Sequence, residues 1–259
     1  MRRLAGGTLF VVWQPRRPGE GPLVLAHRGA SALETENTVA AFRRARIDGA
    51  DGVELDVLLC ATGEVMVFHD DDLRRLGGRP ERVADLPYRT LREVQLPRGT
   101  TIPTLEEALE AAGPRLLVNV ELKANNLGFG PTAALVEAVA GVIARTESAR
   151  RVLVSSFNPW AVHLWTRRAP EVRAAMLLER ASMLPLRRAW LAPWVRPFAL
   201  HPELGLCSAG RVAAWHRRGY QVNVWTVDDP AALRACRRMG VDGVITNDPA
   251  RSRAALASA

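Results

Sequence analysis

Short apolar strands alternate with amphipathic helices along the 259 residues, and this pattern limits the folds that the chain can adopt. Strands are predicted at residues 23–26, 52–59, 116–123, 152–156, 173–178, 198–201, 220–227 and 241–246. Helices are predicted at residues 37–48, 104–112, 131–146, from 159 onward, and at 209–218, 230–239 and 249–257. This alternation is typical of a parallel sheet, and eight such units in a chain of this length favour a (β/α)8 TIM barrel over an open sheet.

We expect a single domain over residues 1–259, because no linker or low-complexity tract divides the chain. Residues 64–69 are predicted to pair with the second strand as a hairpin, and the polar residues 70–103 form a short insertion before the second helix. The Thr104 and Glu107 pair has the capping-box spacing. An apolar run at residues 4–13 is too short to span a membrane, so we interpret it as a strand or hairpin that closes the bottom of the core.

The chain has 35 Lys and Arg against 27 Asp and Glu, a formal net charge of +8. The arginines form scattered pairs rather than one block interleaved with aromatic residues, so no nucleic-acid partner is expected. No later stretch is long enough for membrane insertion, whereas peripheral contact with an anionic surface stays open, as does the oligomeric state. The cysteines Cys60, Cys207 and Cys236 have no paired spacing, which favours a reducing, cytoplasmic location.

Acidic residues are predicted on the inner face of two neighbouring strands. Glu54 and Asp56 lie two apart in the second strand, and Glu121 lies in the third, so period-2 geometry directs all three inward. Buried carboxylates are costly unless they are paired or bind a cation. An all-oxygen set suits Mg²⁺ or Ca²⁺, and the alternative is a metal-free ion network with Arg28 and Lys123.

Two histidines are predicted beside these acids, at the barrel end where the chemistry of this fold occurs. His27 follows the first strand and His69 closes the hairpin. Two histidines that flank a metal and two cations suggest paired proton transfers at a phosphate group. His163 and His216 are expected to be surface or packing residues, while His201 is a candidate for a supporting position.

Short motifs along most of the chain together resemble the glycerophosphodiester phosphodiesterase family. The resemblance covers about residues 23–250 in the family's order and spacing. The motifs are His27-Arg28-Gly29-Ala30-Ser31, Glu36-Asn37-Thr38, Gly49-Ala50-Asp51, Glu54-Leu55-Asp56-Val57, His69-Asp70, Ile102-Pro103-Thr104-Leu105, Glu121-Leu122-Lys123, Val224-Trp225-Thr226 and Ile245-Thr246-Asn247-Asp248-Pro249. The sequence departs from the family pattern at Thr35, at Cys60-Ala61-Thr62-Gly63 and at Arg74-Arg75-Leu76-Gly77.

The resemblance implies a barrel enzyme that hydrolyses glycerophosphodiesters to an alcohol and glycerol 3-phosphate with a divalent cation. The implied site residues are the acid–base pair His27 and His69, the metal ligands Glu54, Asp56 and Glu121, and the substrate-binding residues Arg28, Lys123 and Trp225. The two basic residues would neutralise phosphate charge in the transition state. Trp225 would form an apolar wall against the glycerol moiety, or would instead pack in the barrel core.

Two other functions compete with this interpretation. A lysophospholipase D could use the same site, and the short insertion and the apolar segment around Trp190 and Trp194 motivate it. A non-enzymatic basic binding module is motivated by the charge of +8, but it predicts lost site residues, whereas the proposed ones are all present.

Overall fold

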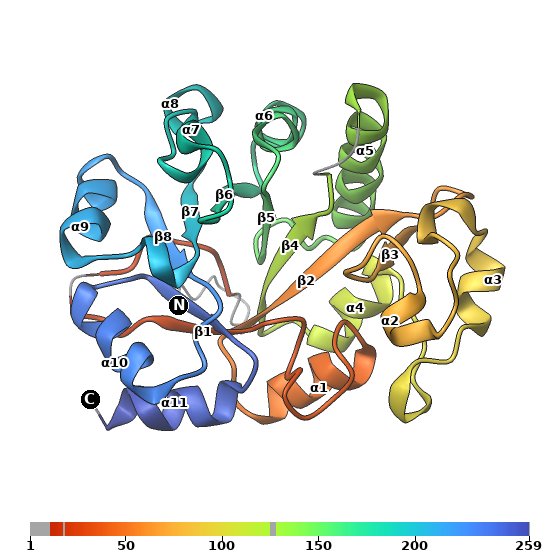
Figure 1. Ribbon diagram of the computed structural model, residues 1–259, viewed down its shortest axis with the longest axis horizontal. Coiled ribbons are helices and arrows are strands. Elements are labelled where there is room, and N and C mark those ends of the chain that lie inside the picture. The colour runs from red at the N-terminus through yellow and green to blue at the C-terminus, as the bar shows by residue number, and fades with distance from the viewer. Residues whose placement is uncertain (1–10, 18, 125–127, 259) are drawn as a thin grey trace, which may run out of the picture.

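The strands of the protein close into a barrel (Figure 1). The computed structural model describes residues 11–17, 19–124 and 128–258. Within them a nine-stranded sheet has the order β1-β9-β8-β7-β6-β5-β4-β2-β3, and an additional parallel β1–β2 pairing closes it, leaving β3 as an antiparallel extension of β2. The strands are β1 (Leu23–Ala26), β2 (Gly52–Leu59), β3 (Val65–Val67), β4 (Leu117–Leu122), β5 (Val152–Ser156), β6 (Arg173–Leu178), β7 (Ala199–Pro202), β8 (Gln221–Val224) and β9 (Gly243–Thr246). The predicted (β/α)8 TIM barrel is confirmed.

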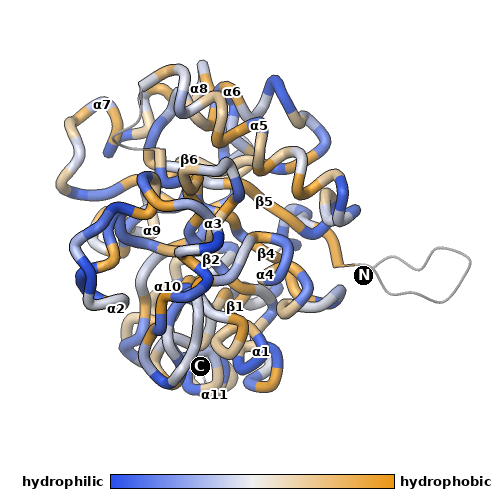
Figure 2. Tube along the Cα trace, turned by 90° about the vertical axis from the view of Figure 1, so that its right-hand side faces the viewer, coloured by the Kyte–Doolittle hydropathy of each residue, from blue (hydrophilic) through white to orange (hydrophobic). Residues whose placement is uncertain are grey.

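Helices connect successive strands and surround the barrel (Figure 1). The longer ones are α1 (Val39–Ile47), α4 (Leu105–Ala112), α5 (Phe129–Arg145), α6 (Pro159–Arg168), α9 (Ala209–Arg217), α10 (Pro230–Met239) and α11 (Pro249–Ala257). The shorter ones are α2 (Arg74–Gly77), α3 (Tyr88–Glu93), α7 (Leu184–Arg187) and α8 (Ala192–Val195). Figure 2 shows polar and apolar residues alternating along these outer helices, as expected where one side packs on a sheet. Most predicted bounds agree closely, but β8 ends at Val224 rather than at residue 227.

Capping side chains determine where several helices begin. The Thr38 hydroxyl accepts the Ala41 amide at the start of α1. Thr104 accepts the Glu107 amide at 3.2 Å, and the Glu107 carboxylate accepts the Thr104 amide at 2.9 Å. This confirms the predicted capping box, which satisfies amides that the helix itself leaves unpaired.

The insertion between β3 and α4 is folded, although its sequence suggested only irregular polar chain. It contains α2, α3 and two 3-10 turns. Leu73, Leu91 and Ile102 are fully buried there and form a small core with Phe68. These apolar residues lack a regular period because they converge from short, separate elements. Since Phe68 belongs to this core, the packing holds the neighbouring His69 at the barrel mouth.

Trp13 lies at the N-terminal end of the barrel. Residues 4–10 of the run predicted as a strand or hairpin lie outside the described residues, and residues 11–13 form no strand. Trp13 is nevertheless buried against Leu25, Leu117 and Leu153, and its indole N–H donates to the Arg151 carbonyl at 2.9 Å. This end of the barrel is therefore filled by side chains. None of the described helices combines the length and apolarity needed to cross a membrane.

Candidate active site

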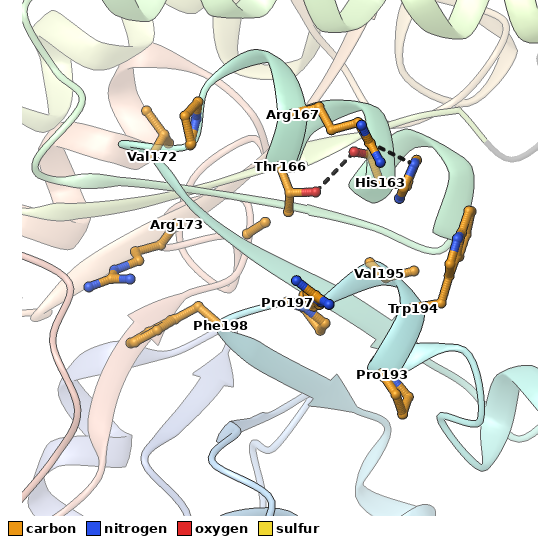
Figure 3. A pocket seen from close by; sticks show the side chains of 13 residues that line it. His163, Thr166, Arg167, Val172, Arg173, Pro193, Trp194, Val195, Pro197 and Phe198 are labelled. Atoms are coloured by element: carbon orange, nitrogen blue, oxygen red, sulfur yellow. Dashed lines mark hydrogen bonds between the residues drawn. The ribbon is translucent and has the colours of Figure 1, made fainter.

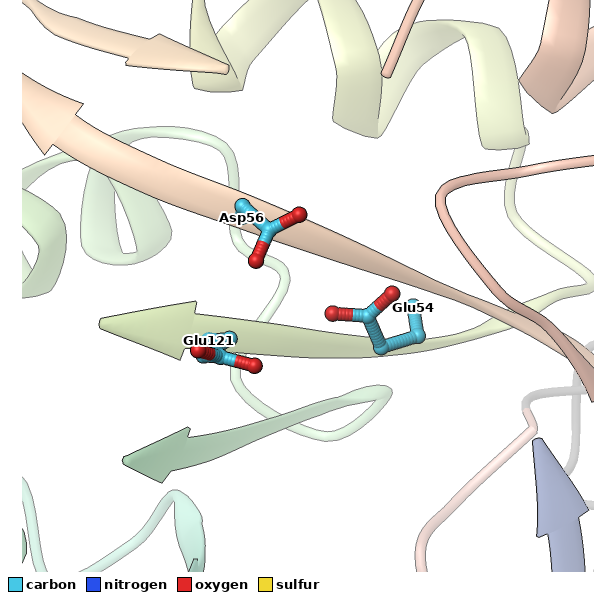
Figure 4. A group of neighbouring side chains, drawn as sticks. All are labelled: Glu54, Asp56 and Glu121. Atoms are coloured by element: carbon cyan, nitrogen blue, oxygen red, sulfur yellow. The ribbon is translucent and has the colours of Figure 1, made fainter. Parts of the chain in front are cut away.

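Three buried carboxylates converge from two neighbouring strands (Figure 4). Glu54 and Asp56 project from β2, and Glu121 projects from β4 at the position paired with Asp56. Each offers an oxygen that lies within 4.8 Å of the others. The structure thus brings together the three acids that the strand periodicity directs inward, in an arrangement that can hold a divalent cation.

Two basic side chains contact this acidic cluster. The Lys123 Nζ lies 3.0 Å from Glu121 Oε1 and 3.5 Å from Asp56 Oδ1. Arg28 Nε lies 3.3 Å from Asp56 Oδ2, while the Arg28 amide donates to Glu54 Oε2 at 2.9 Å. Both cations therefore lie beside the acidic cluster, at the C-terminal ends of β1 and β4.

The turn after β1 directs the Arg28 amide at the cluster. Arg28 has a φ of 54° and Gly29 a φ of 81°, so two successive residues are in the left-handed region. A Cβ on Gly29 would lie 2.6 Å from the Ala41 Cβ. Glycine is required here both by its φ and by the close approach of α1.

The charges of the cluster do not balance. Burial and the charge of Asp56 raise the pKa of Glu54 to about 8. Burial and Asp56 also raise the pKa of Glu121 to about 8. Burial opposes ionisation of Asp56 as well, but Lys123 and Arg28 hold its pKa below the usual value. Two of the three acids therefore retain protons near neutral pH unless another cation is present.

A divalent cation fits this donor set. The side-chain oxygen of Asn119 is buried, faces the same pocket and has no hydrogen-bond partner among the described residues. Hard cations prefer carboxylate and amide oxygens. Excess buried acid together with an unsatisfied oxygen is the pattern expected around such an ion, whereas a self-contained ion network would leave neither.

His27 is oriented by a chain of polar side chains. Its Nδ1 lies 2.8 Å from Asn247 Oδ1, which also accepts the Ser31 hydroxyl at 2.9 Å. The Asn247 amide nitrogen donates to Asp228 Oδ2 at 2.6 Å, which fixes the amide so that its oxygen accepts from His27. The proton of neutral His27 consequently lies on Nδ1, and Nε2 is left for chemistry. Burial and the nearby Arg28 lower the pKa of His27.

His69 is oriented by a second set of contacts. Its Nδ1 donates to Asp70 Oδ1 at 2.6 Å, and Arg75 Nε donates to Asp70 Oδ2 at 2.7 Å. Arg75 also pairs with Glu36 at 2.6 Å, and Glu36 pairs with Arg28 at 2.8 Å. Burial is the main cause that lowers the pKa of His69. The departure from the family pattern at Arg74-Arg75-Leu76-Gly77 therefore keeps an arginine that supports His69.

A cavity of about 290 Å³ is lined by both histidines and by Glu54 and Glu121 of the cluster. Its apolar wall includes Trp225 and Phe157, whose ring centroids lie 5.5 Å apart in an edge-to-face arrangement. Trp225 lines the cavity, and its indole N–H donates to the His201 backbone carbonyl at 2.7 Å. The His201 side chain is fully buried and bonds to Asn223 rather than to Trp225.

Sequence reasoning did not assign roles to several residues of this site. Asn247 and Asp70 stand in motifs that carry the resemblance, so their presence was visible, but their partners Asp228 and Arg75 were not. Phe157 and Glu179 line the cavity from the ends of β5 and β6. Both residues directly follow a predicted strand. Because active sites of this fold lie at the C-terminal ends of the strands, that position could have indicated that they line the site.

A larger cavity of about 610 Å³ lies outside the barrel, between α6 and the segment that precedes β7 (Figure 3). Residues such as Arg167, Trp194 and Phe198 line it, and no carboxylate does. Without acids or an oriented histidine pair, this cavity offers none of the chemistry found at the barrel mouth.

A sequence model described as the Glycerophosphoryl diester phosphodiesterase family matches residues 27–251. This chain belongs to that family. It is 32% identical over 235 residues to a glycerophosphodiester phosphodiesterase of Caldanaerobacter subterraneus subsp. tengcongensis, covering 88% of this chain and 94% of that protein. It is 33% identical over 240 residues to a probable glycerophosphodiester phosphodiesterase 2 of Mycobacterium tuberculosis, covering 88% of each.

Solved structures agree with the family assignment. An Oleispira antarctica phosphodiesterase in complex with the product sn-glycerol-3-phosphate superposes with a TM-score of 0.83 at 26% identity, covering 92% of this chain and 97% of that one. A Thermotoga maritima glycerophosphodiester phosphodiesterase has a TM-score of 0.72 at 29% identity, covering 89% and 96%. As a member of the glycerophosphodiester phosphodiesterase family, the protein is a phosphoric diester hydrolase, as the sequence predicted, and not a non-enzymatic binding module.

Proposed function

We propose that this protein hydrolyses glycerophosphodiesters to an alcohol and glycerol 3-phosphate, with His27 and His69 as its acid–base pair. The observation that carries the proposal is that both histidines line one cavity at the C-terminal end of the barrel together with Glu54 and Glu121, whose carboxylates lie beside that of Asp56. The Oleispira relative that binds glycerol 3-phosphate as its product supports the same substrate class.

Glu54, Asp56 and Glu121 would hold a divalent cation, Mg²⁺ or Ca²⁺. When bound, this cation supplies Lewis-acid stabilisation of charge at the phosphoryl group. Lys123 and Arg28, each in contact with Asp56, add fixed positive charge beside the same position. Their charges are aimed at oxygens that become more negative in the transition state.

The histidines act through Nε2, because Nδ1 of each is held by an acceptor. Nε2 of one histidine accepts the proton of the attacking hydroxyl, which comes from water or from the glycerol moiety itself. As the bond from phosphorus to the leaving oxygen breaks, protonated Nε2 of the other histidine donates its proton to that oxygen. Burial lowers the pKa of both imidazoles, which favours the neutral form that the base needs and makes the protonated partner a stronger acid.

Hydrolysis of glycerophosphocholine and glycerophosphoethanolamine in Mg²⁺ or Ca²⁺ tests this function. We expect His27→Ala and His69→Ala each to lose about 100-fold or more in turnover, as for removal of a general acid or base. His163→Ala is the matched control, because His163 lies on α6 outside the site and should retain activity. Full turnover by His27→Ala would overturn the mechanism, and inactivity of the wild type with every cation would overturn the function.

A lysophospholipase D activity at the same site is the second candidate. Leu177, Phe157 and Trp225 give the cavity an apolar side that could contact an acyl chain. Kinetics on lysophosphatidylcholine and glycerophosphocholine, measured side by side, separate the two substrates. Inactivity on the lysolipid would remove this candidate and leave the first one intact.

A further inference from the structure

Exposed apolar side chains are concentrated in the segment between β6 and β7. Met183 is 74% exposed, Trp190 59% and Trp194 50%, and Leu184 is also exposed. Among the described residues, the other large exposed apolar side chains are Val12, Ile47 and Phe129. Side chains of this size scattered singly need no explanation, but several in one short segment indicate a surface that meets something apolar.

The patch is held in place by stacking on the neighbouring helix. The Trp194 ring stacks on His163 of α6, with centroids 4.2 Å apart and planes 9° apart (Figure 3). Trp160 at the start of α6 stacks with Trp194 at 6.4 Å, and Phe129 at the start of α5 contacts Trp160 edge-on at 5.1 Å. Figure 1 shows α5, α6, α7 and α8 along one edge of the molecule, and the ring contacts link Phe129 of α5 through Trp160 of α6 to Trp194 of α8.

Arginines without acidic partners surround the same segment. Residues 180–196 include Arg180, Arg187, Arg188 and Arg196 but no Asp or Glu. No salt bridge among the described residues involves any of these arginines. Elsewhere the arginines often pair with acids, as Arg168 does with Glu137. The Glu203 carboxylate accepts the Arg180 backbone amide at 2.7 Å, so the positive charge without a salt bridge beside the apolar patch is mainly that of Arg187, Arg188 and Arg196.

Four arginines also line one cavity. It measures about 520 Å³, lies between the segments that follow β6 and β7, and is lined by Arg180, Arg187, Arg188 and Arg211. No carboxylate lines it. Guanidinium groups match phosphate oxygens in charge and geometry, so a phosphate group is the ligand that this cavity fits. Arg180 directly follows Glu179, which lines the active-site cavity.

We propose that the α7–α8 surface, formed by Met183, Leu184, Trp190 and Trp194 with Arg180, Arg187 and Arg188, docks the enzyme on an anionic lipid bilayer. Tryptophan and long apolar side chains enter the interfacial region of a bilayer, while arginines bind the phosphates of anionic lipids. A phosphorylated soluble partner would engage the arginines but would leave the exposed Met183 and Trp190 unexplained. Docking by this surface places the barrel mouth beside the bilayer, whichever ester the site cleaves.

Co-sedimentation with vesicles tests the docking surface. The probes are vesicles of phosphatidylcholine alone and of phosphatidylcholine mixed with phosphatidylglycerol. We expect the wild type to partition onto the anionic vesicles and not onto the neutral ones. Reversing the charge at Arg187→Glu and Arg188→Glu together should weaken partitioning roughly tenfold or more, because each interfacial arginine contributes separately. The pair Met183→Ser and Trp190→Ser should have a similar effect.

Matched controls separate this surface from net charge alone. Arg115→Glu with Arg145→Glu makes the same change in charge at exposed positions, before β4 and at the end of α5, toward the opposite end of the barrel. Ile47→Ser removes an apolar side chain that is 77% exposed on α1. Both controls should keep wild-type partitioning, and all variants should hydrolyse glycerophosphocholine at the wild-type rate.

Three outcomes would overturn the docking proposal. One is equal partitioning of the wild type onto neutral and anionic vesicles. Another is a loss of partitioning in the control variants as large as that in the variants of the α7–α8 surface. The third is binding of RNA or a phosphopeptide, but not of vesicles, that depends on Arg187 and Arg188. Because the readout is partitioning, it stays separable from a failure of the proposed hydrolysis.

Discussion

Lys123 is the single lysine among 35 basic residues, all others being arginine. Its ammonium lies 3.0 Å from Glu121 and 3.5 Å from Asp56, in a position that is largely buried. Burial opposes its charge, but Glu121 and Asp56 together raise the pKa of Lys123 above the usual value. A compact ammonium fits between two carboxylates and a phosphate where a planar guanidinium is broader and demands a different hydrogen-bond geometry.

We therefore predict that Lys123→Arg reduces turnover at least about tenfold, which corresponds to roughly 1.4 kcal/mol in the activation barrier. Steady-state kinetics on glycerophosphocholine measure this loss. Arg145→Lys, an exchange of the same two residue types on the exposed surface of α5, is the control and should leave turnover unchanged. Near wild-type turnover of Lys123→Arg would indicate that compositional bias alone explains the lone lysine.

His201 should make folding stability depend on pH. It is fully buried, its Nε2 accepts the Asn223 amide at 2.9 Å, and burial lowers its pKa to about 3. In the unfolded chain the pKa of His201 is near 6.5. As the pH falls below that value, the unfolded state therefore binds a proton at His201, whereas the folded state does not. The contribution of His201 to the free energy of unfolding is complete above about pH 6.5. It is lost progressively toward pH 3, with about 2 kcal/mol lost by pH 5.

Urea unfolding at pH 8 and pH 5 measures this effect, with His201→Gln as the comparison. The loss of unfolding free energy between the two pH values should be about 2 kcal/mol smaller in the variant, because the carboxylates contribute equally to both proteins. An identical pH dependence in the two proteins would show that His201 does not titrate in this way.

At the scale of elements, the sequence predicted what local patterns encode. The β2 strand was predictable because its apolar residues alternate with Glu54 and Asp56, and the start of α4 because Thr104 and Glu107 form a local capping box. The folded insertion between β3 and α4 was not predictable, because Leu73 and Ile102 meet only through tertiary packing. The contact between His27 and Asn247 spans 220 residues, so no local pattern could reveal it.

The segment before β1 gives a prediction at this scale. Trp13 packs on residues from several strands at the closed end of the barrel, and its indole is bonded to the Arg151 carbonyl. We expect Trp13→Ala to reduce the unfolding free energy by about 3–5 kcal/mol, as for a large aromatic side chain removed from a core. Urea denaturation followed by circular dichroism measures it.

Trp190→Ala is the matched control for that substitution, because Trp190 is 59% exposed and its loss should cost at most about 0.5 kcal/mol. A loss at Trp13 no larger than in this control would mean that the N-terminal segment does not seal the barrel. Activity of the folded Trp13→Ala protein should persist, since the proposed chemistry lies at the opposite end.

Closure of the whole barrel brings the site together from the entire chain. His27 directly follows β1, Glu121 lies in β4 and Trp225 directly follows β8, and the β1–β9 pairing joins the first and last strands of the chain. The cost of this assembly is that three buried acids are contacted by only two basic side chains among the described residues, Lys123 and Arg28. A cation that neutralises them binds the folded chain only, because the unfolded chain does not hold the three carboxylates together.

Mg²⁺ or Ca²⁺ should therefore stabilise the protein in a pH-dependent manner. At a concentration about 100 times the dissociation constant, the free energy of unfolding should rise by about 2.7 kcal/mol. Because the pKa values of Glu54 and Glu121 are raised to about 8 without the ion, binding must displace protons. Affinity should thus fall as the pH is lowered from 8 to 6, by up to about tenfold per pH unit for each proton released.

Calorimetric titration in two buffers of different ionisation enthalpy measures both the affinity and the number of protons released. Glu121→Gln removes the negative charge of one proposed metal ligand together with its titrating proton. The variant should therefore bind the ion more weakly and release fewer protons. Asp242→Asn is a control outside the cluster, since Asp242 pairs with His216 on the far side of β8, and it should match the wild type in proton release. Binding of the cation without proton release at pH 7 would contradict the raised pKa values, and no binding at all would contradict the metal site itself.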